Sequence, residues 1–135
     1  MFKFGKRSIN NLKGLHPRLV EFANELIKIS PYDFTIIEGI RTVEKQKSLF
    51  QQGRTQPGKT ITNCDGLIKK SKHQIQKDGY GHAFDIVILI NNQATWNSKL
   101  YDNLGKVAGE LLKKYNVIWG GNWKNFKDRP HFQIS

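Results

Sequence analysis

A chain of 135 residues is long enough for one domain with its own hydrophobic core and too short for two ordinary ones. Its 22 basic and 11 acidic residues give a formal net charge of +11, which favours a polyanionic partner but fits nucleic acid and an anionic cell wall equally well. The lone cysteine, Cys64, excludes an intramolecular disulfide, and no apolar run approaches the roughly 20 residues that a membrane-spanning helix needs.

The first part of the chain predicts two helices around a short strand. Residues 1–7 form a basic arm, and because neither an apolar h-region nor a small-residue cleavage site follows it, we expect synthesis in a cytoplasm without a secretory signal. Apolar residues recur at helical spacing over 18–29, and aromatic and β-branched residues predict a strand over 34–37. Thr42 is a suitable N-cap for a second helix over 43–52.

The rest of the chain predicts a long loop followed by a mainly β region. Residues 53–81 are rich in glycine and other turn formers and lack periodicity, and a loop of this length in a compact domain is usually functional or disordered. Beyond it we expect a helix over 98–115 and strands over 83–90, 117–119 and 131–134. This order predicts a single α+β domain over 1–135, with a small antiparallel sheet and helices packed on one side.

Three side chains that are distant in the sequence make a candidate metal-ligand set. His73 stands in the long loop, Asp85 interrupts an apolar strand where an unpaired carboxylate is costly to bury, and His131 opens the last strand. Two imidazoles and one carboxylate leave the fourth tetrahedral position of a zinc ion open for water, as in catalytic sites. Each residue alone also has an ordinary structural interpretation, such as an ion pair or a loop position. Their joint occurrence favours zinc.

These side chains belong to two sequence motifs. The first has the form Ser-x-His…Gly-x-Ala-x-Asp, at Ser71, His73, Gly81, Ala83 and Asp85. The second is Asp-Arg-Pro-His-Phe at 128–132, and Glu-Gly-Ile-Arg-Thr stands upstream at 38–42. In these motifs the chain resembles the zinc peptidases of the D-alanyl-D-alanine carboxypeptidase and L-alanyl-D-glutamate endopeptidase superfamily, most closely the small phage and prophage endolysins. Segments at 53–59 and 119–123 are also typical of that branch.

The resemblance implies specific roles for five residues. His73, Asp85 and His131 would ligate zinc, at a site formed by the sheet edge and loops. Asp128 would deprotonate the attacking water and later protonate the leaving amine, and Arg41 would stabilise the oxyanion of the tetrahedral intermediate. Three more residues each have a functional and a structural interpretation. Ser71 would bind a substrate carboxylate or orient His73, or it caps the loop. Gln46 would brace Arg41 or faces solvent, and Trp119 would line a substrate cleft or packs in the core.

Two features depart from the family pattern. The separation between the first histidine and the aspartate is twelve residues here (85 − 73), which is longer than usual, and we expect the additional residues to form a loop that restores the register. The longer spacing makes His82 a rival ligand and Asp78 a weaker one. Strand alternation argues against His82, because a residue three positions from Asp85 points to the opposite face. Gln133 stands where family members often carry glutamate.

The resemblance implies a zinc metallopeptidase that cuts an amide bond in the stem peptides of bacterial peptidoglycan, most closely the L-alanyl-D-glutamate bond, as a phage-type endolysin. The alternative within the same fold is a D,D-carboxypeptidase that removes terminal D-alanine. A basic cell-wall or nucleic-acid-binding domain is the non-enzymatic alternative, which the scattered basic residues disfavour. We expect a monomer without a nucleic-acid partner or stable membrane association, made in the host cytoplasm and reaching the wall after holin-type release.

Overall fold

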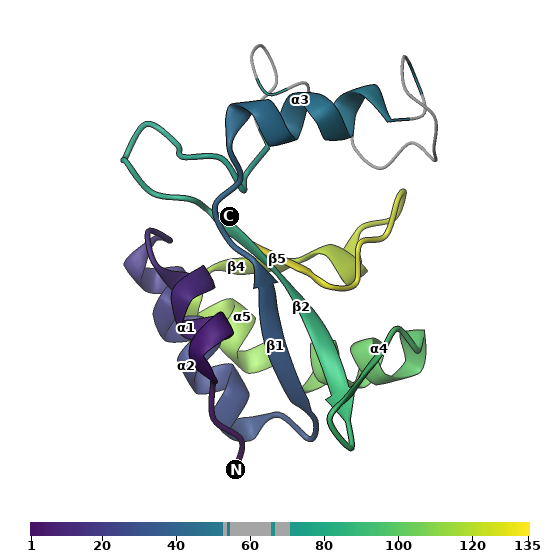
Figure 1. Ribbon diagram of the computed structural model, residues 1–135. Helices are drawn as coiled ribbons and strands as arrows, with labels where there is room; N and C mark the ends of the chain where they lie inside the picture. The colour runs from purple at the N-terminus through teal and green to yellow at the C-terminus, as the bar shows by residue number, and fades with distance from the viewer. Residues whose placement is uncertain (53, 55–65, 67–70) are drawn as a thin grey trace.

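The computed structural model describes residues 1–52, 54, 66 and 71–135 (Figure 1). Its elements are, in chain order, α1 (Lys6–Leu12), α2 (Pro17–Ile29), β1 (Asp33–Glu38), α3 (Val43–Gln51), β2 (Ala83–Ile90), β3 (Gln93–Thr95), α4 (Ser98–Val107), α5 (Gly109–Tyr115), β4 (Val117–Trp119), the 3-10 turn η1 (Gly120–Asn122) and β5 (His131–Ile134). The strands of the described residues form one antiparallel sheet in the order β1-β2-β5-β4, with β3 on the C-terminal half of β2. The predicted α+β fold is confirmed.

Helices surround this sheet unequally. Figure 1 shows α1, α2 and α5 to the left of β1 and β2, α3 across the top of the molecule, and α4 to the right. Helix α4 is tied to the sheet by the Tyr101 hydroxyl, which donates to the Thr95 carbonyl at 2.8 Å and accepts from the Ile88 amide at 3.0 Å. Within the described part of the chain, no helix combines the length and the apolar character that crossing a bilayer requires.

The two faces of the inner strands β2 and β5 carry different chemistry. Phe84 pairs with Phe132 in register, and the next pair is Asp85 with His131. Since successive side chains alternate between faces, the phenylalanines enter the core while Asp85 and His131 point to the opposite side. A slip of one residue would exchange these two faces. The register of β2 against β5 therefore decides whether the candidate ligands meet.

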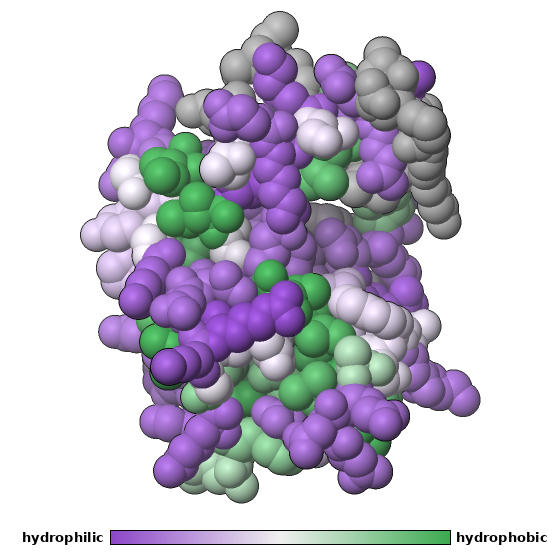
Figure 2. Space-filling view, in the orientation of Figure 1, coloured by the Kyte–Doolittle hydropathy of each residue, from purple (hydrophilic) through white to green (hydrophobic). Residues whose placement is uncertain are grey.

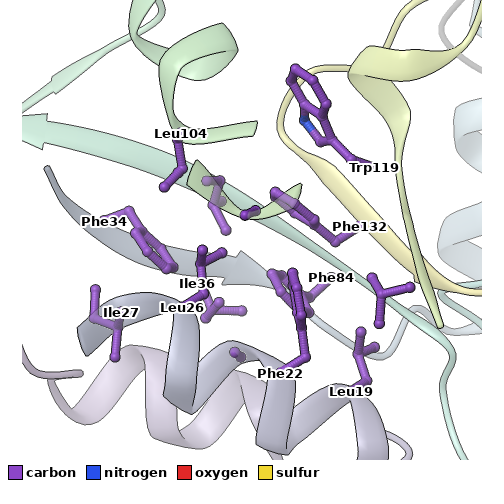
Figure 3. Close-up of a cluster of buried hydrophobic side chains, with 14 of the residues drawn as sticks. Leu19, Phe22, Leu26, Ile27, Phe34, Ile36, Phe84, Leu104, Trp119 and Phe132 are labelled. Carbon is purple, nitrogen blue, oxygen red and sulfur yellow. The ribbon is translucent and has the colours of Figure 1, made fainter. Parts of the chain in front are cut away.

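Aromatic packing fixes that register. The rings of Phe84 and Phe132 stack with centroids 5.4 Å apart, and Phe22 of α2 lies 5.5 Å from Phe132 (Figure 3). All three side chains are at most 1% exposed, and burial of one phenylalanine side chain is worth about 1.5–3 kcal/mol. The hydrophobic face of the sheet thus stabilises the arrangement of the polar face.

Several element boundaries differ from those that the sequence predicts. Helix α1 begins at Lys6, inside the expected basic arm of 1–7, and the buried Ser8 hydroxyl joins this helix to β1, because it accepts a hydrogen bond from the Ile36 amide at 2.9 Å. The helix expected over 98–115 is two helices that meet at Ala108. Most of the loop expected over 53–81 lies outside the described residues.

Strand β3 was not predicted, because it is short and contains no β-branched run. The preceding Asn91 and Asn92 both have positive φ, of 52° and 64°. Two consecutive residues in this conformation form the tight hairpin turn whose twist matches that of paired strands. The two asparagines therefore return the chain along β2 instead of ending the sheet there.

Candidate metal centre and active site

Three separate segments bring the predicted ligands together. Asp85 of β2 and His131 of β5 face each other across the strand pair, and His73 comes from the loop before β2. One ligand atom from each lies within 4.8 Å of the others. Asp85 and His131 stand on the inner strands of the sheet, close to the loop-bearing ends, so the cluster occupies a face of the sheet more than its edge. Figure 2 shows the surface hollowed on the right, between the layer of α3 and the rest of the molecule.

Each imidazole is oriented by an acceptor on its outer side. His73 Nδ1 lies 2.9 Å from the Gly39 carbonyl oxygen, and His131 Nε2 lies 2.9 Å from Gln133 Oε1. Because such oxygens only accept hydrogen bonds, these ring nitrogens carry the protons. The inner nitrogens then face Asp85 Oδ1, at 3.3 Å for His73 and 3.0 Å for His131. Outer partners of this kind hold metal-ligating histidines in the required tautomer.

The additional residues between His73 and Asp85 form a small turn that leaves the register intact. The Gln76 amide donates to the Tyr80 carbonyl at 2.8 Å, and Gly79 has a φ of 86°, which favours glycine. The turn is closed by the His82 amide, which donates to the Lys72 carbonyl at 2.8 Å. The expected compensation for the long spacing is therefore present in the structure.

The two rival ligands lie outside the cluster. His82 Nε2 lies 2.7 Å from Asp78 Oδ2, so the two side chains pair with each other. The His82 ring also packs edge-on against His16, with centroids 5.7 Å apart. This orientation follows from strand alternation, which directs His82 away from the face of Asp85.

Arg41 enters the site from the segment between β1 and α3. Its Nε donates to Glu38 Oε1, and its Nη1 donates to Gln46 Oε1 at 2.7 Å. Its Nη2 lies 4.0 Å from Asp85 Oδ2, and its main-chain amide donates to the His73 carbonyl at 2.8 Å. The guanidinium is therefore held on two sides, directly beside the ligand cluster.

The partners of Arg41 depend on one bulge and one helix. A register shift between Ile36 and Glu38 in β1 pairs Glu38 with Asp85, on the polar face of the sheet. Gln46 projects from α3, which begins after the Thr42 cap as predicted, and its side chain is fully buried. Of the two interpretations of Gln46, the structure thus favours bracing of Arg41 over a solvent-facing position.

Asp128 stands beside His131, in the segment before β5. Its Oδ2 is 4.0 Å from His131 Nδ1, so it neighbours the cluster without belonging to it. Its main-chain amide donates to the Gly120 carbonyl at 3.1 Å. A Cβ at position 120 would stand 2.2 Å from the Asp128 carbonyl oxygen, so this close approach requires glycine. The Gly-Gly turn after β4 thereby positions Asp128.

Trp119 and Ser71, each of which had a functional and a structural interpretation, make structural contacts. Trp119 is 7% exposed, packs in the core and donates from Nε1 to the Arg129 carbonyl at 2.7 Å, so core packing replaces the suggested role in a substrate cleft. Trp123 is the tryptophan beside the site, with its ring 5.4 Å from that of His131. The Ser71 hydroxyl accepts from the His73 amide at 3.2 Å, which is a loop-capping contact.

Two side chains at the site were assigned no role by the sequence, Glu38 and Gln133, and Trp123 was considered only as a residue that could line a substrate cleft. A usable signal existed only for Gln133, because a residue two positions from His131 on a strand shares its face. Glu38 reaches this face through the bulge in β1, and the bulge itself has no clear sequence signature. The position of Trp123 follows from the turn η1, which is also a tertiary feature.

Burial and mutual charge shift the pKa values of these groups. Burial alone would raise the pKa of Asp85, but the neighbouring His73 and His131 outweigh it and hold this pKa well below its usual range. Burial raises the pKa of Asp128, and the Asp85 carboxylate adds to the shift. For His131 burial acts to lower the pKa, yet the hydrogen bond to Asp85, the charge of Asp85 and the hydrogen bond to Gln133 together outweigh burial and raise this pKa. Asp85 is thus an anion, and the raised pKa of Asp128 favours a group that both accepts and returns a proton.

Comparison with known proteins agrees with this geometry. The model of the phage L-alanyl-D-glutamate peptidase family matches residues 1–133. The chain belongs to this family. Among its relatives, the L-alanyl-D-glutamate peptidase of Escherichia phage T5 is 33% identical over 133 residues, covering 90% of this chain and 82% of the relative. The peptidoglycan L-alanyl-D-glutamate endopeptidase CwlK of Bacillus subtilis is 30% identical over 129 residues, covering 89% and 73%.

A solved structure extends the likeness to three dimensions. The crystal structure of the L-Ala D-Glu endopeptidase ChiX of Serratia marcescens superposes on this phage peptidase-family chain with a TM-score of 0.76 and 28% sequence identity. The match covers 98% of this chain and 90% of ChiX. The resemblance seen in the sequence motifs therefore extends over the whole fold.

Proposed function

We propose that this chain is a zinc-dependent peptidase that hydrolyses the L-alanyl-D-glutamate bond in the stem peptides of bacterial peptidoglycan. The convergence of His73, Asp85 and His131, with Arg41 beside Asp85 and Asp128 beside His131, carries the proposal. Membership of the phage L-alanyl-D-glutamate peptidase family supports the choice of bond. A D,D-carboxypeptidase with the same fold is the alternative that products distinguish.

The donor set fits a catalytic zinc ion. Two neutral imidazole nitrogens and one carboxylate are ligands that zinc prefers, and a set of three leaves a position for water. A zinc ion held there supplies a Lewis acid and lowers the pKa of its water to about 7. His73 and His131 would bind through the nitrogens that face Asp85, since Gly39 and Gln133 occupy the other two. The negative charge of Asp85 would offset part of the charge of the cation.

Asp128 is the proposed general base and acid. Its carboxylate lies close enough to the cluster to accept a proton from the attacking water, and it then delivers this proton to the amine of the departing D-glutamyl fragment. The raised pKa of Asp128 assists both transfers, because a base with a pKa nearer the working pH also serves as an acid. Burial beside Asp85 is the physical cause of this shift.

Arg41 is the proposed oxyanion stabiliser. Hydrolysis places negative charge on the carbonyl oxygen, and a donor that is fixed in advance stabilises that charge without reorganisation. Glu38 and Gln46 hold two sides of the guanidinium, so Nη2 is directed at the cluster. Loss of one such donor typically lowers kcat by about 10²–10³.

Digestion of purified peptidoglycan tests the proposal. We expect the wild type to release peptides with new N-terminal D-glutamate, identified by mass spectrometry. Asp128→Asn should retain zinc and lose cleavage, while Asp78→Asn makes the same chemical change outside the cluster and should remain active. Release of free D-alanine would assign the carboxypeptidase reaction instead. Zinc binding without any cleavage by the wild type would refute a peptidase acting on this substrate.

The proposal includes where this peptidase is made and where it acts. Relatives from Escherichia phage T5 and Listeria phage A118 support the role of a phage-type endolysin. Such an enzyme would be made in the host cytoplasm and reach the wall after holin-type release, acting as a monomer without nucleic acid or stable membrane association. The charge of +11 suits an anionic wall.

A further inference from the structure

A pocket of about 210 Å³ lies beside Asp128, lined by residues from the start of α4 and from the segment before β5. Its walls include Trp96, Tyr101, Lys127 and Arg129. Pockets for drug-sized ligands usually measure about 300–1,000 Å³, so this one suits a single amino-acid residue. The hydrolytic steps assigned to Asp128 and Arg41 make no use of these walls.

One wall of the pocket is aromatic, with Trp96 exposed on top of a buried Tyr101. Trp96 stacks on Tyr101 with ring planes 1° apart and centroids separated by 6.0 Å. Tyr101 is itself fixed by the two hydrogen bonds of its hydroxyl to the sheet. Trp96 is nevertheless 60% exposed. A flat apolar surface that is held in place without a covering group is suited to packing against a bound residue.

The pocket lining also includes two cations, Lys127 and Arg129, one on each side of Asp128 in the sequence. Arg129 donates from Nε to Asp102 Oδ1 at 2.9 Å, so part of its charge is neutralised. Lys127 donates from Nζ to the Gly121 carbonyl at 3.1 Å and, among the described residues, forms no ion pair within 4.0 Å. An ammonium group has three donors, so Lys127 keeps its charge and two N–H groups for an anionic ligand.

The orientation of the substrate in the site follows from the proposed function, and this inference rests on that function. Since Asp128 protonates the leaving amine, the departing fragment lies on the side of Asp128. In a peptidoglycan stem this fragment begins with D-glutamate, which is joined to the next residue through its γ-carboxyl. Its α-carboxylate therefore stands one carbon from the leaving nitrogen. The acyl fragment, L-alanine on a lactyl ether, has no charge at this distance.

We propose that the pocket receives the D-glutamyl residue and that Lys127 binds its α-carboxylate. Trp96, held in place by its stacking on Tyr101, would then cover the apolar methylene groups of the same residue. The charge of Lys127 makes the pocket selective for a stem with a free α-carboxylate over one in which this group is an amide. Lys127 is thus a specificity-determining residue of the leaving side.

The test compares two synthetic stem peptides that differ only in α-carboxylate or α-carboxamide. We expect the wild type to favour the carboxylate by about tenfold in kcat/KM, the effect of one charge-assisted hydrogen bond, expressed mainly in KM. Lys127→Met should lose this preference, and Lys127→Arg should keep it. Lys124→Met removes the same charge from an exposed position in the same segment and should behave as the wild type. Zinc content and melting temperature check the fold of each variant.

Two results would overturn the assignment. Equal kcat/KM of the wild type for both peptides would show that the α-carboxylate is not recognised. An equal loss on both peptides in Lys127→Met would show that Lys127 only positions Asp128. A wild type that cuts neither peptide would remove the proposed peptidase function itself, which is a different outcome from cleavage without preference.

Discussion

Gln133 holds the imidazole of His131, and its replacement by leucine should weaken zinc binding. The Gln133 Oε1 atom lies 2.9 Å from Nε2 of His131, a residue that is only 6% exposed. Leucine preserves an apolar stem of similar reach but offers no acceptor. Nε2–H is then left without this partner in a nearly dry position, which costs about 1–3 kcal/mol. The proton is also free to move to the nitrogen that faces Asp85.

The expected result is a zinc dissociation constant about 10–100 times higher, the usual effect of losing such an outer partner. Competition with a chromophoric chelator measures this constant, and the melting temperature with and without zinc gives an independent value. Gln133→Glu restores an acceptor and should recover most of the affinity. Gln93→Leu, an exposed glutamine in β3, controls for the loss of an amide. Unchanged zinc affinity in Gln133→Leu would refute the role assigned to the outer hydrogen bond.

Three further predictions concern the oxyanion donor, the ligand proton and the core. Arg41→Lys keeps the charge, but a lysine cannot hydrogen-bond Glu38 and Gln46 together. The kcat on stem peptides should therefore fall by about 10² while the zinc content stays unchanged. A near-normal kcat would contradict the proposed role of Arg41 in stabilising the oxyanion. The raised pKa of His131 means that this imidazole keeps its proton to higher pH, and a protonated nitrogen cannot bind zinc. The zinc affinity measured by calorimetry should therefore decrease as the pH falls through this pKa. An affinity that does not change with pH would contradict zinc binding by His131. Phe132→Ala should lower the free energy of unfolding by about 3–5 kcal/mol in urea titrations, and a loss below about 1 kcal/mol would contradict the core assignment.

Local patterns were enough to locate the inner strands. The apolar run over 83–90 and the short run over 131–134 coincide with β2 and β5. Likewise Thr42 caps α3, with its hydroxyl accepting from the Lys45 amide at 3.1 Å. Such signals act over a few residues, so they do not depend on the remainder of the fold.

Tertiary packing changed the predictions that relied on longer stretches. One continuous helix was expected over 98–115, but the chain forms two helices, and Val107 is 39% exposed where α4 gives way to α5. Trp119 and Trp123 are equivalent in the sequence, on either side of a turn. The core receives Trp119 because the ring packs against Gly105, where a Cβ would approach it to 2.4 Å. No pattern within either segment contains this contact.

By itself, the sequence determined which residue types are available for chemistry: two histidines and an aspartate in recognisable motifs, with Asp128 and Arg41 nearby in those motifs. Only the tertiary structure decided which imidazole nitrogen faces the cluster, through the Gly39 carbonyl and Gln133. It also placed Lys127 and Trp96 around one pocket. The physical reason is that motif spacing reflects local backbone geometry, whereas these contacts join strands and loops whose separation in the sequence is long and whose register is set by the core.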